Sequence, residues 1–322
     1  MRHLLIMNPG SKGGKSKKYF ELIHSLMKKY SLTYDFKETS SLNDAYDFCI
    51  EGHSLNYDAI IAVGGDGTIN RVLNGFFTNR GTLRSNAVMG VIYSGTSPDF
   101  CKSYGIPTET EKAVQLISFG KTKKIKAGMI THCETYDPRF EGKFVDEITE
   151  RGVSFFGCCA NIGLGAAIAS GANKGIRKIT GDKLGTFIST VKAIKNHTPS
   201  NLKTLIDEKE VTFKKAANLS IGRTKYIASG LKVPHELNHD DEKMYIMSAQ
   251  NMNFYKWLTS LIKVYKGVPF ENDGSLSLSY CSKISVAGNN SFPRIEFDGD
   301  PAGFLPCEIE LAKEPLTLFA EE

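Results

Sequence analysis

The sequence predicts an α/β domain built on a parallel sheet, followed by an antiparallel β-sandwich domain. The first third of the chain alternates strand-like and helix-like segments, whereas short strand-like segments dominate after about residue 125. Strands separated by helices are typical of right-handed βαβ units, and many short strands with turns between them are typical of sandwiches. We therefore expect domains over residues 1–125 and 126–302, with residues 303–322 packed back onto the first domain.

In the first domain, four apolar segments are expected to form neighbouring strands. Ligands of such sheets bind beyond the carboxyl ends of the strands, so the loops that begin there should converge on one edge. These loops begin at Asn8, Thr39, Gly64 and Gly95. The predicted strands cover residues 3–7, 33–36, 59–63 and 87–93, and the predicted helices cover 17–30, 42–51 and a segment beginning at Thr68.

The second domain is expected to contain mainly short strands. Helices are expected only at 183–195 and 253–266, and the polar region 133–151 is expected to form an inserted loop or hairpin. The aromatic face of the second helix suits either a buried core or a membrane interface. The strands are predicted at 153–159, 202–206, 217–221, 244–249, 276–280, 283–286, 294–297, 307–311 and 316–319.

Composition favours a cytoplasmic protein. The 322 residues carry a formal net charge of +5, which is too small to argue for nucleic acid. The seven cysteines show no metal spacing, which favours reduced, buried thiols. Residues 1–7 are too short for a signal peptide, and glycines interrupt the uncharged stretch 152–173, so no transmembrane segment is expected. Lysine clusters near the start and at 121–126 suit phosphate groups or an anionic membrane surface.

The turn Gly64-Gly65-Asp66-Gly67-Thr68 is the most informative motif. It joins an apolar run to a helical pattern. Glycines let backbone N–H groups approach an anion, and a helix N-terminus adds partial positive charge, so the turn suits phosphate. Asp66 would repel a bare phosphate, which indicates a magnesium ion or a proton to be moved. The alternative is an ordinary strand-to-helix turn.

A second glycine-rich loop, residues 8–16, joins the first strand to the first helix. Three residues separate Gly10 from Gly14, whereas a Walker A motif needs four, so this is not a P-loop. Glycines, lysines, a serine and a helix N-terminus still favour phosphate binding. A flexible basic loop is the alternative.

With these loops in view, the chain resembles the diacylglycerol kinase catalytic family, the lipid kinases that include sphingosine and ceramide kinases. The family's Asn-Pro-x-x-Gly opening, Gly-Gly-Asp-Gly-Thr core and Gly-Thr-x-Asn-Asp-Phe loop correspond to residues 8–10, 64–68 and 95–100. Further matches follow in order along nearly the whole chain: Thr39 before Asp44-Ala45, Gly222-Arg223, residues 230–234, and Asp298-Gly299-Asp300 in place of Asp-Gly-Glu.

The resemblance implies a cleft between the domains that holds ATP, Mg²⁺ and a lipid hydroxyl at a membrane surface. It implies Asp300 as the proton acceptor, with Asp298 beside it and Asp66 as a second candidate that also meets the metal through ATP. Asp99 is implied on the substrate side. The implied ATP-binding residues are Asn8, Pro9, Gly10, Ser11, Lys12, Thr39, Gly64, Gly65, Asp66, Gly67, Thr68, Asn70, Arg71, Gly95 and Thr96.

Several residues depart from the family pattern. Arg71 replaces a Glu, Pro98 replaces an Asn, and Asp300 replaces a longer Glu. The family's Asp-Asp-Gly, which holds a structural magnesium, corresponds to Asp240-Asp241-Glu242, where Glu242 makes the tight turn less easy. Residues 298–300 taken alone also suit a β-turn.

Two other functions stay open. An NAD kinase, or a kinase of another soluble alcohol, could share the glycine core, although the loop at 95–100 weighs against it. A non-catalytic nucleotide or lipid binder is the other alternative, motivated by Arg71 and Pro98. A homodimer is left open, and the histidines show no zinc spacing.

Overall fold

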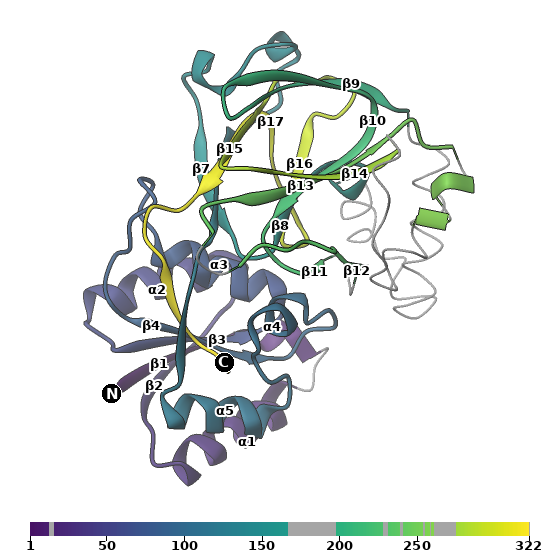
Figure 1. Cartoon of the computed structure of the whole chain (residues 1–322). Helices are drawn as coiled ribbons and strands as arrows, with labels where there is room; N and C mark the ends of the chain where they lie inside the picture. The colour runs from purple at the N-terminus through teal and green to yellow at the C-terminus, as the bar shows by residue number, and fades with distance from the viewer. Residues whose placement is uncertain are drawn as a thin grey trace.

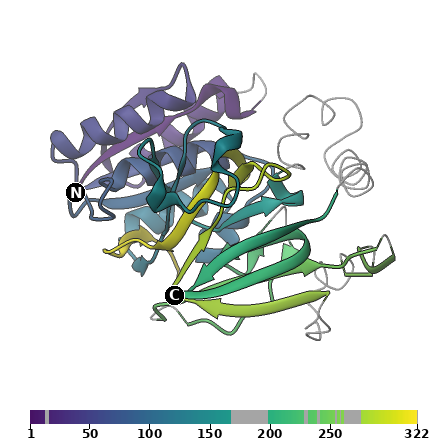
Figure 2. The ribbon, with the colours of Figure 1, turned by 90° about the horizontal axis from the view of Figure 1, so that it is seen from above.

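The computed structural model describes residues 1–12, 16–166, 198–227, 231–238, 241–253, 255–257, 259–260 and 275–321, except for a few side chains that include those of Ser11, Lys12 and Asp300. The described elements form a six-stranded sheet flanked by helices and a larger antiparallel sheet (Figure 1). This is the predicted fold class. Viewed from above, the purple and blue α/β part lies next to the green antiparallel part (Figure 2).

The six-stranded sheet has the order β2-β1-β3-β4-β18-β5, and its first four strands are parallel. β1, β3 and β4 are buried on both faces because alternate residues meet different helices, whereas the edge strand β2 is largely exposed. Leu4 and Ile6 pack with α2 and α3, while Leu5 and Met7 pack with α1 and α5. The elements are β1 (Arg2–Met7), α1 (Ser16–Lys29), β2 (Thr33–Glu38), α2 (Leu42–Ser54), β3 (Ala59–Gly64), α3 (Asp66–Phe76), β4 (Val88–Tyr93), α4 (Asp99–Tyr104) and α5 (Thr110–Phe119).

The chain returns to this sheet at its C-terminal end. β18 (Leu316–Phe319) lies between β4 and β5 (Thr122–Ile125), parallel to β4 and antiparallel to β5. The preceding strand, β17 (Asp300–Leu311), belongs to the antiparallel sheet. The return therefore begins later than the expected boundary after residue 302.

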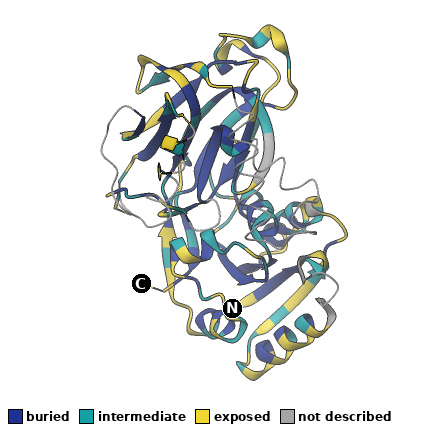
Figure 3. Ribbon diagram, turned by 90° about the vertical axis from the view of Figure 1, so that its right-hand side faces the viewer, coloured by how far each residue is buried: buried dark blue, intermediate teal, exposed yellow. Residues whose placement is uncertain are grey.

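The antiparallel sheet closes on itself through one long strand. β10 pairs with β9 through its first half and with β8 and β13 through its second half. The enclosed core contains residues such as Phe156, Ile221 and Ile284. Figure 3 shows both buried and exposed segments in this part of the molecule. The strands are β6 (Gly128–Cys133), β7 (Gly152–Phe156), β8 (Cys159–Gly163), β9 (Ser200–Ile206), β10 (Lys209–Gly222), β13 (Met244–Gln250), β14 (Leu276–Cys281), β15 (Lys283–Val286), β16 (Arg294–Phe297) and β17, with the short pair β11 (Tyr226–Ile227) and β12 (Leu231–Lys232).

Two features differ from the expectations. The predicted strand 153–159 is two strands, because the chain turns at Gly157-Cys158 between β7 and β8. The helices α4 and α5 and the strands β5, β6, β11 and β12 were not expected. Between β6 and β7 the chain forms a loop with two short 3₁₀ turns, Pro138–Phe140 and Val145–Glu147, as expected for region 133–151. The predicted helix 183–195 lies outside the described residues, as does most of the helix predicted at 253–266. Within the described ranges, no helix combines the length and apolar character needed to cross a bilayer.

Candidate active site

The loops that follow the parallel strands meet at one edge of the sheet. The backbone N–H of Asn8 donates to Val63 O (2.9 Å), that of Thr39 donates to Met7 O (2.9 Å), and that of Ser94 donates to Gly64 O (2.9 Å). Each bond joins the end of one strand to the end of its neighbour. The loops predicted to bind nucleotide are therefore neighbours.

Glycines allow two of these loops to touch. A Cβ on Gly64 would lie 2.4 Å from Thr68 Oγ1, and a Cβ on Gly95 would lie 2.9 Å from Gly65 Cα. A side chain at Gly95 would push its loop away from the glycine turn, whereas a side chain at Gly64 would clash with Thr68 within the turn. Gly65 is also the N-cap residue of α3. Because glycine has no side chain, the cap residue offers no side-chain acceptor to the backbone N–H groups of the first turn.

Asn8 links the first loop to the glycine turn. Its Nδ2 donates to Thr68 Oγ1 (2.9 Å), and its Oδ1 accepts the backbone N–H of Gly10 (2.9 Å). The loop then enters the 3₁₀ turn Pro9–Lys12. The side chains of Ser11 and Lys12 lie outside the description, so their roles stay predictions.

Asp66 lies in the first turn of α3, where burial and nearby carboxylates act on it. Burial, together with the charges of Asp99 and Asp298, raises its pKa to about 7, although a hydrogen bond from Tyr93 opposes the shift. Tyr93 Oη donates to Asp66 Oδ2 (3.2 Å) and accepts the backbone N–H of Ser97 (2.7 Å). Sequence reasoning missed Tyr93, although an aromatic residue ending a strand directly before a predicted site loop was a usable signal.

Two of the departures from the family pattern, Pro98 and Arg71, lie at α4 and α3, the helices that begin with Asp99 and Asp66. Pro98 precedes α4, and Asp99 lies in the first turn of α4, close enough for its charge to act on Asp66. Thr96 is exposed. Arg71 lies on α3, and its Nε is buried without a hydrogen-bond acceptor among the described residues. A guanidinium N–H without an acceptor suits an anionic group, as does the neighbouring glycine turn.

Asp298 and Gly299 form the two-residue turn between β16 and β17. Phe297 pairs with Asp300, and both turn residues have positive φ, +52° and +93°. An Asp-Gly pair favours such a turn because each residue tolerates this conformation. The β-turn interpretation of this motif therefore applies. The side chain of Asp300 is outside the description, and its role stays a prediction.

The Asp298 carboxylate is held by three N–H donors. It accepts from the backbone of Gly157 (2.6 Å), the backbone of Cys158 (2.8 Å) and Asn70 Nδ2 (3.1 Å). Burial raises the pKa of Asp298, although all three hydrogen bonds oppose this rise. The bonds fix its direction, and the bond from Asn70 ties the hairpin to α3.

A second asparagine strengthens the contact between α3 and β7. Asn74 Nδ2 donates to Phe155 O (2.8 Å), and Asn74 Oδ1 accepts the backbone N–H of Phe155 (2.8 Å). Asn70 Nδ2 also donates to Phe155 O (3.0 Å). The rings of Phe77 and Phe155 stack with centroids 4.5 Å apart. The helix that begins at the glycine turn is thus fixed to the antiparallel domain.

Glu296 holds the hairpin from the other side. Its side chain accepts the backbone N–H of Gly299 and, at 2.6 Å, Asn161 Nδ2. Asn161 Oδ1 in turn accepts from Ser220 Oγ (2.5 Å). These polar side chains are buried on the neighbouring strands β16, β8 and β10. Because buried polar groups need partners, this network specifies where the Asp298 hairpin lies.

The predicted structural magnesium site lies only partly within the described residues. Asp240 lies outside them, and Asp241 lies on the loop before β13. Asp241 Oδ2 accepts the backbone N–H of Asn238 (2.7 Å). In the part of the chain that the structure describes, no group of three or more His, Cys, Asp or Glu residues could hold a metal ion.

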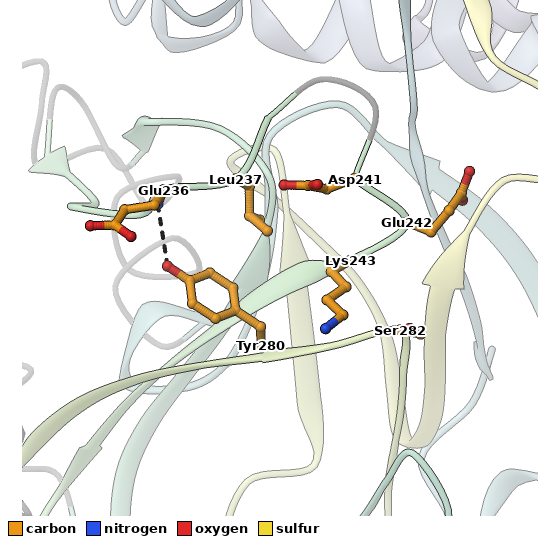
Figure 4. A pocket seen from close by; sticks show the side chains of 7 residues that line it. All are labelled: Glu236, Leu237, Asp241, Glu242, Lys243, Tyr280 and Ser282. Carbon is orange, nitrogen blue, oxygen red and sulfur yellow. Dashed lines mark hydrogen bonds between the residues drawn. The ribbon is translucent and has the colours of Figure 1, made fainter.

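Asp241 lines a pocket of about 350 Å³ with Glu236, Leu237, Glu242, Lys243, Tyr280 and Ser282 (Figure 4). The carboxylates of Glu236, Asp241 and Glu242 point in different directions in this view. Such a divergent set is a poor cage for a hard cation, which takes several oxygen ligands at once.

Known proteins resemble this chain in sequence and in fold. Residues 2–130 match the model of the diacylglycerol kinase catalytic domain. A Streptococcus pneumoniae protein named "Putative lipid kinase" is 24% identical over 320 residues, 99% of this chain and 97% of that protein. The diacylglycerol kinase of Bacillus subtilis is 32% identical over 130 residues, 40% of this chain and 42% of that protein.

A solved structure, described as a putative diacylglycerol kinase from Bacillus anthracis, shares the fold with a TM-score of 0.73. It is 21% identical, and the match covers 99% of this chain and 97% of that one. Together these findings confirm the resemblance of this chain to the diacylglycerol kinase catalytic family.

Proposed function

We propose that this protein is a lipid kinase that transfers the γ-phosphate of ATP, with magnesium, to a hydroxyl of a lipid such as diacylglycerol. The observation that carries the proposal is the link from the converged glycine loops, through Asn70, to the Asp298 hairpin. Phosphoryl transfer depends mainly on positioning and charge neutralisation, and this link joins the two predicted halves of the site.

The nucleotide side of the proposal rests on the glycine turn and its neighbours. Backbone N–H groups at the start of α3 suit phosphate oxygens, and Arg71 offers a guanidinium N–H without an acceptor in the described structure. Asp66 would meet a magnesium ion held mainly by substrate phosphates, because Mg²⁺ is usually bound by one or two carboxylates together with phosphate oxygens. The ion would supply charge neutralisation there.

On the side of the site that receives the lipid hydroxyl, we assign different carboxylates to proton transfer and to positioning. Asp66 and Asp300 remain the two candidates for the group that takes the proton of the lipid hydroxyl. We assign Asp298 a positioning role, because its carboxylate already accepts three N–H bonds. It would hold the turn so that residue 300 keeps a constant position relative to α3.

A phosphate-transfer assay with labelled ATP and magnesium tests the proposal. Diacylglycerol, sphingosine, ceramide and phosphatidylglycerol are offered in mixed micelles, and NAD is offered in solution. We expect label in one lipid and a large loss in Asp66→Asn. Label in NADP would support the soluble-substrate alternative instead. ATP binding without transfer to any acceptor would support the non-catalytic one.

A further inference from the structure

The six-stranded sheet ends in two edge strands of different character. β5 carries Lys123 and Lys124, with Lys121 and Lys126 on either side of it. Lysines along an edge repel a second strand, which is a common way to protect the edge. β2, at the other edge, contains no proline and pairs with β1 through all 6 residues without a register shift. Because β2 is also largely exposed, it offers a regular and uncovered edge.

The outward backbone groups of β2 belong to Tyr34, Phe36 and Glu38. At the end of the strand, the backbone N–H of Thr39 donates to Met7 O of β1 (2.9 Å). The N–H and C=O groups of successive residues in a strand point alternately to its two sides, so the odd-numbered residues of β2 face β1 and the even-numbered ones face outward. In the described part of the chain, no backbone hydrogen bond reaches these outward groups.

The side chains of β2 divide between the two faces of the sheet. On the α1 face, Phe36 is 50% exposed, and the centroids of its ring and the His24 ring lie 4.7 Å apart. On the opposite face, the exposed Asp35 and the half-buried Lys37 each form an ion pair within the chain. One face of the edge thus presents an aromatic ring, and the other presents one negative and one positive side chain.

These side chains favour one way of pairing two copies of β2. Directly opposed residues of an antiparallel pair share a face of the sheet, so a two-fold axis must pass through a single residue of the strand. An axis through Asp35 or Lys37 would set like charges against each other, and an axis nearer either end of the strand would pair fewer residues. An axis through Phe36 sets Asp35 of each copy against Lys37 of the other and brings the two Phe36 rings together. Opposite charges and aromatic pairs stabilise such contacts.

We propose that β2 pairs antiparallel with β2 of a second copy of this chain, about a two-fold axis through Phe36. In this register Phe36 meets its own copy through both N–H···O bonds and Tyr34 meets Glu38 in the same way, so every outward backbone group of β2 is used. The two six-stranded sheets then form one continuous sheet. Because the paired strands run in opposite directions, the loop-bearing edges of the two sheets face opposite ways, and neither candidate site lies in the interface. The proposal is independent of the proposed activity.

Sedimentation velocity of the purified full chain over a wide range of concentrations tests the proposal. We expect a reversible dimer, and a wild-type protein that stays monomeric at every concentration would overturn the proposal. Phe36→Lys sets two like charges at the axis and removes the aromatic pair, so it should raise the dimer dissociation constant by about tenfold or more. The control Phe119→Lys changes a 65% exposed phenylalanine at the end of α5, before the other edge strand, and should leave the dissociation constant unchanged. Equal dissociation constants for the two variants would overturn the proposal.

Cysteine cross-linking tests the register, and it serves as the test if Phe36→Lys does not fold. All seven native cysteines are buried. Directly opposed residues of an antiparallel pair have Cα atoms about 4.5 to 5.5 Å apart, within the usual range for a disulfide. Mild oxidation of a mixture of Asp35→Cys and Lys37→Cys, one of them tagged, should therefore give a covalent dimer of the two variants, and neither variant alone should give one. No cross-link in the mixture, or equal cross-linking of each variant alone, would overturn the proposal.

Discussion

Replacing Asn70 by Ala should separate positioning from stability. The variant loses the hydrogen bonds that Asn70 donates to Asp298 Oδ2 (3.1 Å) and to Phe155 O (3.0 Å). It also loses the bond that Asn70 Oδ1 accepts from Asn74 Nδ2 (3.1 Å). Neither acceptor is left unpaired, because Phe155 O keeps Asn74 Nδ2 and Asp298 keeps the N–H of Gly157. One lost bond goes to a carboxylate, so we expect a loss of about 2 kcal/mol in the free energy of unfolding.

The effect on turnover should be larger than this stability loss suggests. Without the Asn70 side chain, no hydrogen bond from that residue joins the hairpin at Asp298 to α3. A displacement of a catalytic group by about 1 Å can lower the rate about 100-fold. We therefore expect kcat to fall by about 10- to 100-fold. The assay is ATP-dependent phosphorylation of the accepted lipid, with KM for ATP and urea unfolding measured in parallel.

Asn74→Ala is the matched control. Asn74 lies on the same helix as Asn70, and its substitution removes the paired bonds to the Phe155 backbone of β7. The hydrogen bonds of Asn74 go to Phe155 and Asn70, and none goes to Asp298. Its stability should fall by a similar amount while kcat falls much less. The positioning argument fails if the two variants lose kcat equally, or if Asn70→Ala changes only KM for ATP.

Three further predictions concern the glycine loops. Because the pKa of Asp66 is raised from 3.8 to about 7, the folded protein favours the protonated form; the extra stability is therefore full below about pH 4 and is lost as pH rises through 7. Urea unfolding of nucleotide-free protein should show this fall in the wild type, and the same fall in Asp66→Asn would contradict it. Tyr93→Phe removes a hydrogen bond that lowers the pKa of Asp66, so the fall should move to higher pH; an unmoved or lowered midpoint would count against the contact. Gly95→Ala places a Cβ 2.5 Å from Tyr93 Oη and 2.9 Å from Gly65 Cα, so it should cost about 1–3 kcal/mol of stability and weaken ATP binding in calorimetric titration; wild-type affinity would show that the loops need not touch.

Local patterns were sufficient for most of the fold. β1, β3 and β4 are continuous apolar runs that are buried on both faces. These runs predicted the bounds of the three strands within about one residue. The patterns failed where the decisive partner is distant in sequence. The turn at Gly157-Cys158 splits an apolar run because its N–H groups bind Asp298, 140 or more residues away. β5 is mostly polar and exposed, so only its pairing with β18 identifies it as a strand.

The candidate site divides in the same way. Glycines and carboxylates at strand ends are visible in the chain, because close approach and charge restrict residue type at those positions. Tyr93 and Glu296 are ordinary strand residues in the sequence, and their roles arise from contacts with Asp66 and the Asp298 hairpin. The role of Asp298 could not be assigned from the sequence Asp298-Gly299-Asp300 alone, because the same residues suit both a β-turn and a catalytic carboxylate.

The sequence by itself determined the two-domain fold class, the strand-end loops and the family resemblance, because glycine turns and hydrophobic periodicity are local properties. Tertiary structure decided what several charged residues do. Asp298 became a hairpin anchor because its carboxylate meets N–H groups from β7–β8 and α3. The Arg223 guanidinium donates to the backbone carbonyls of Asn238, Asp241 and Lys243, which only the folded chain brings close to it. Hydrogen bonds between distant segments depend on packing, which a linear pattern does not contain.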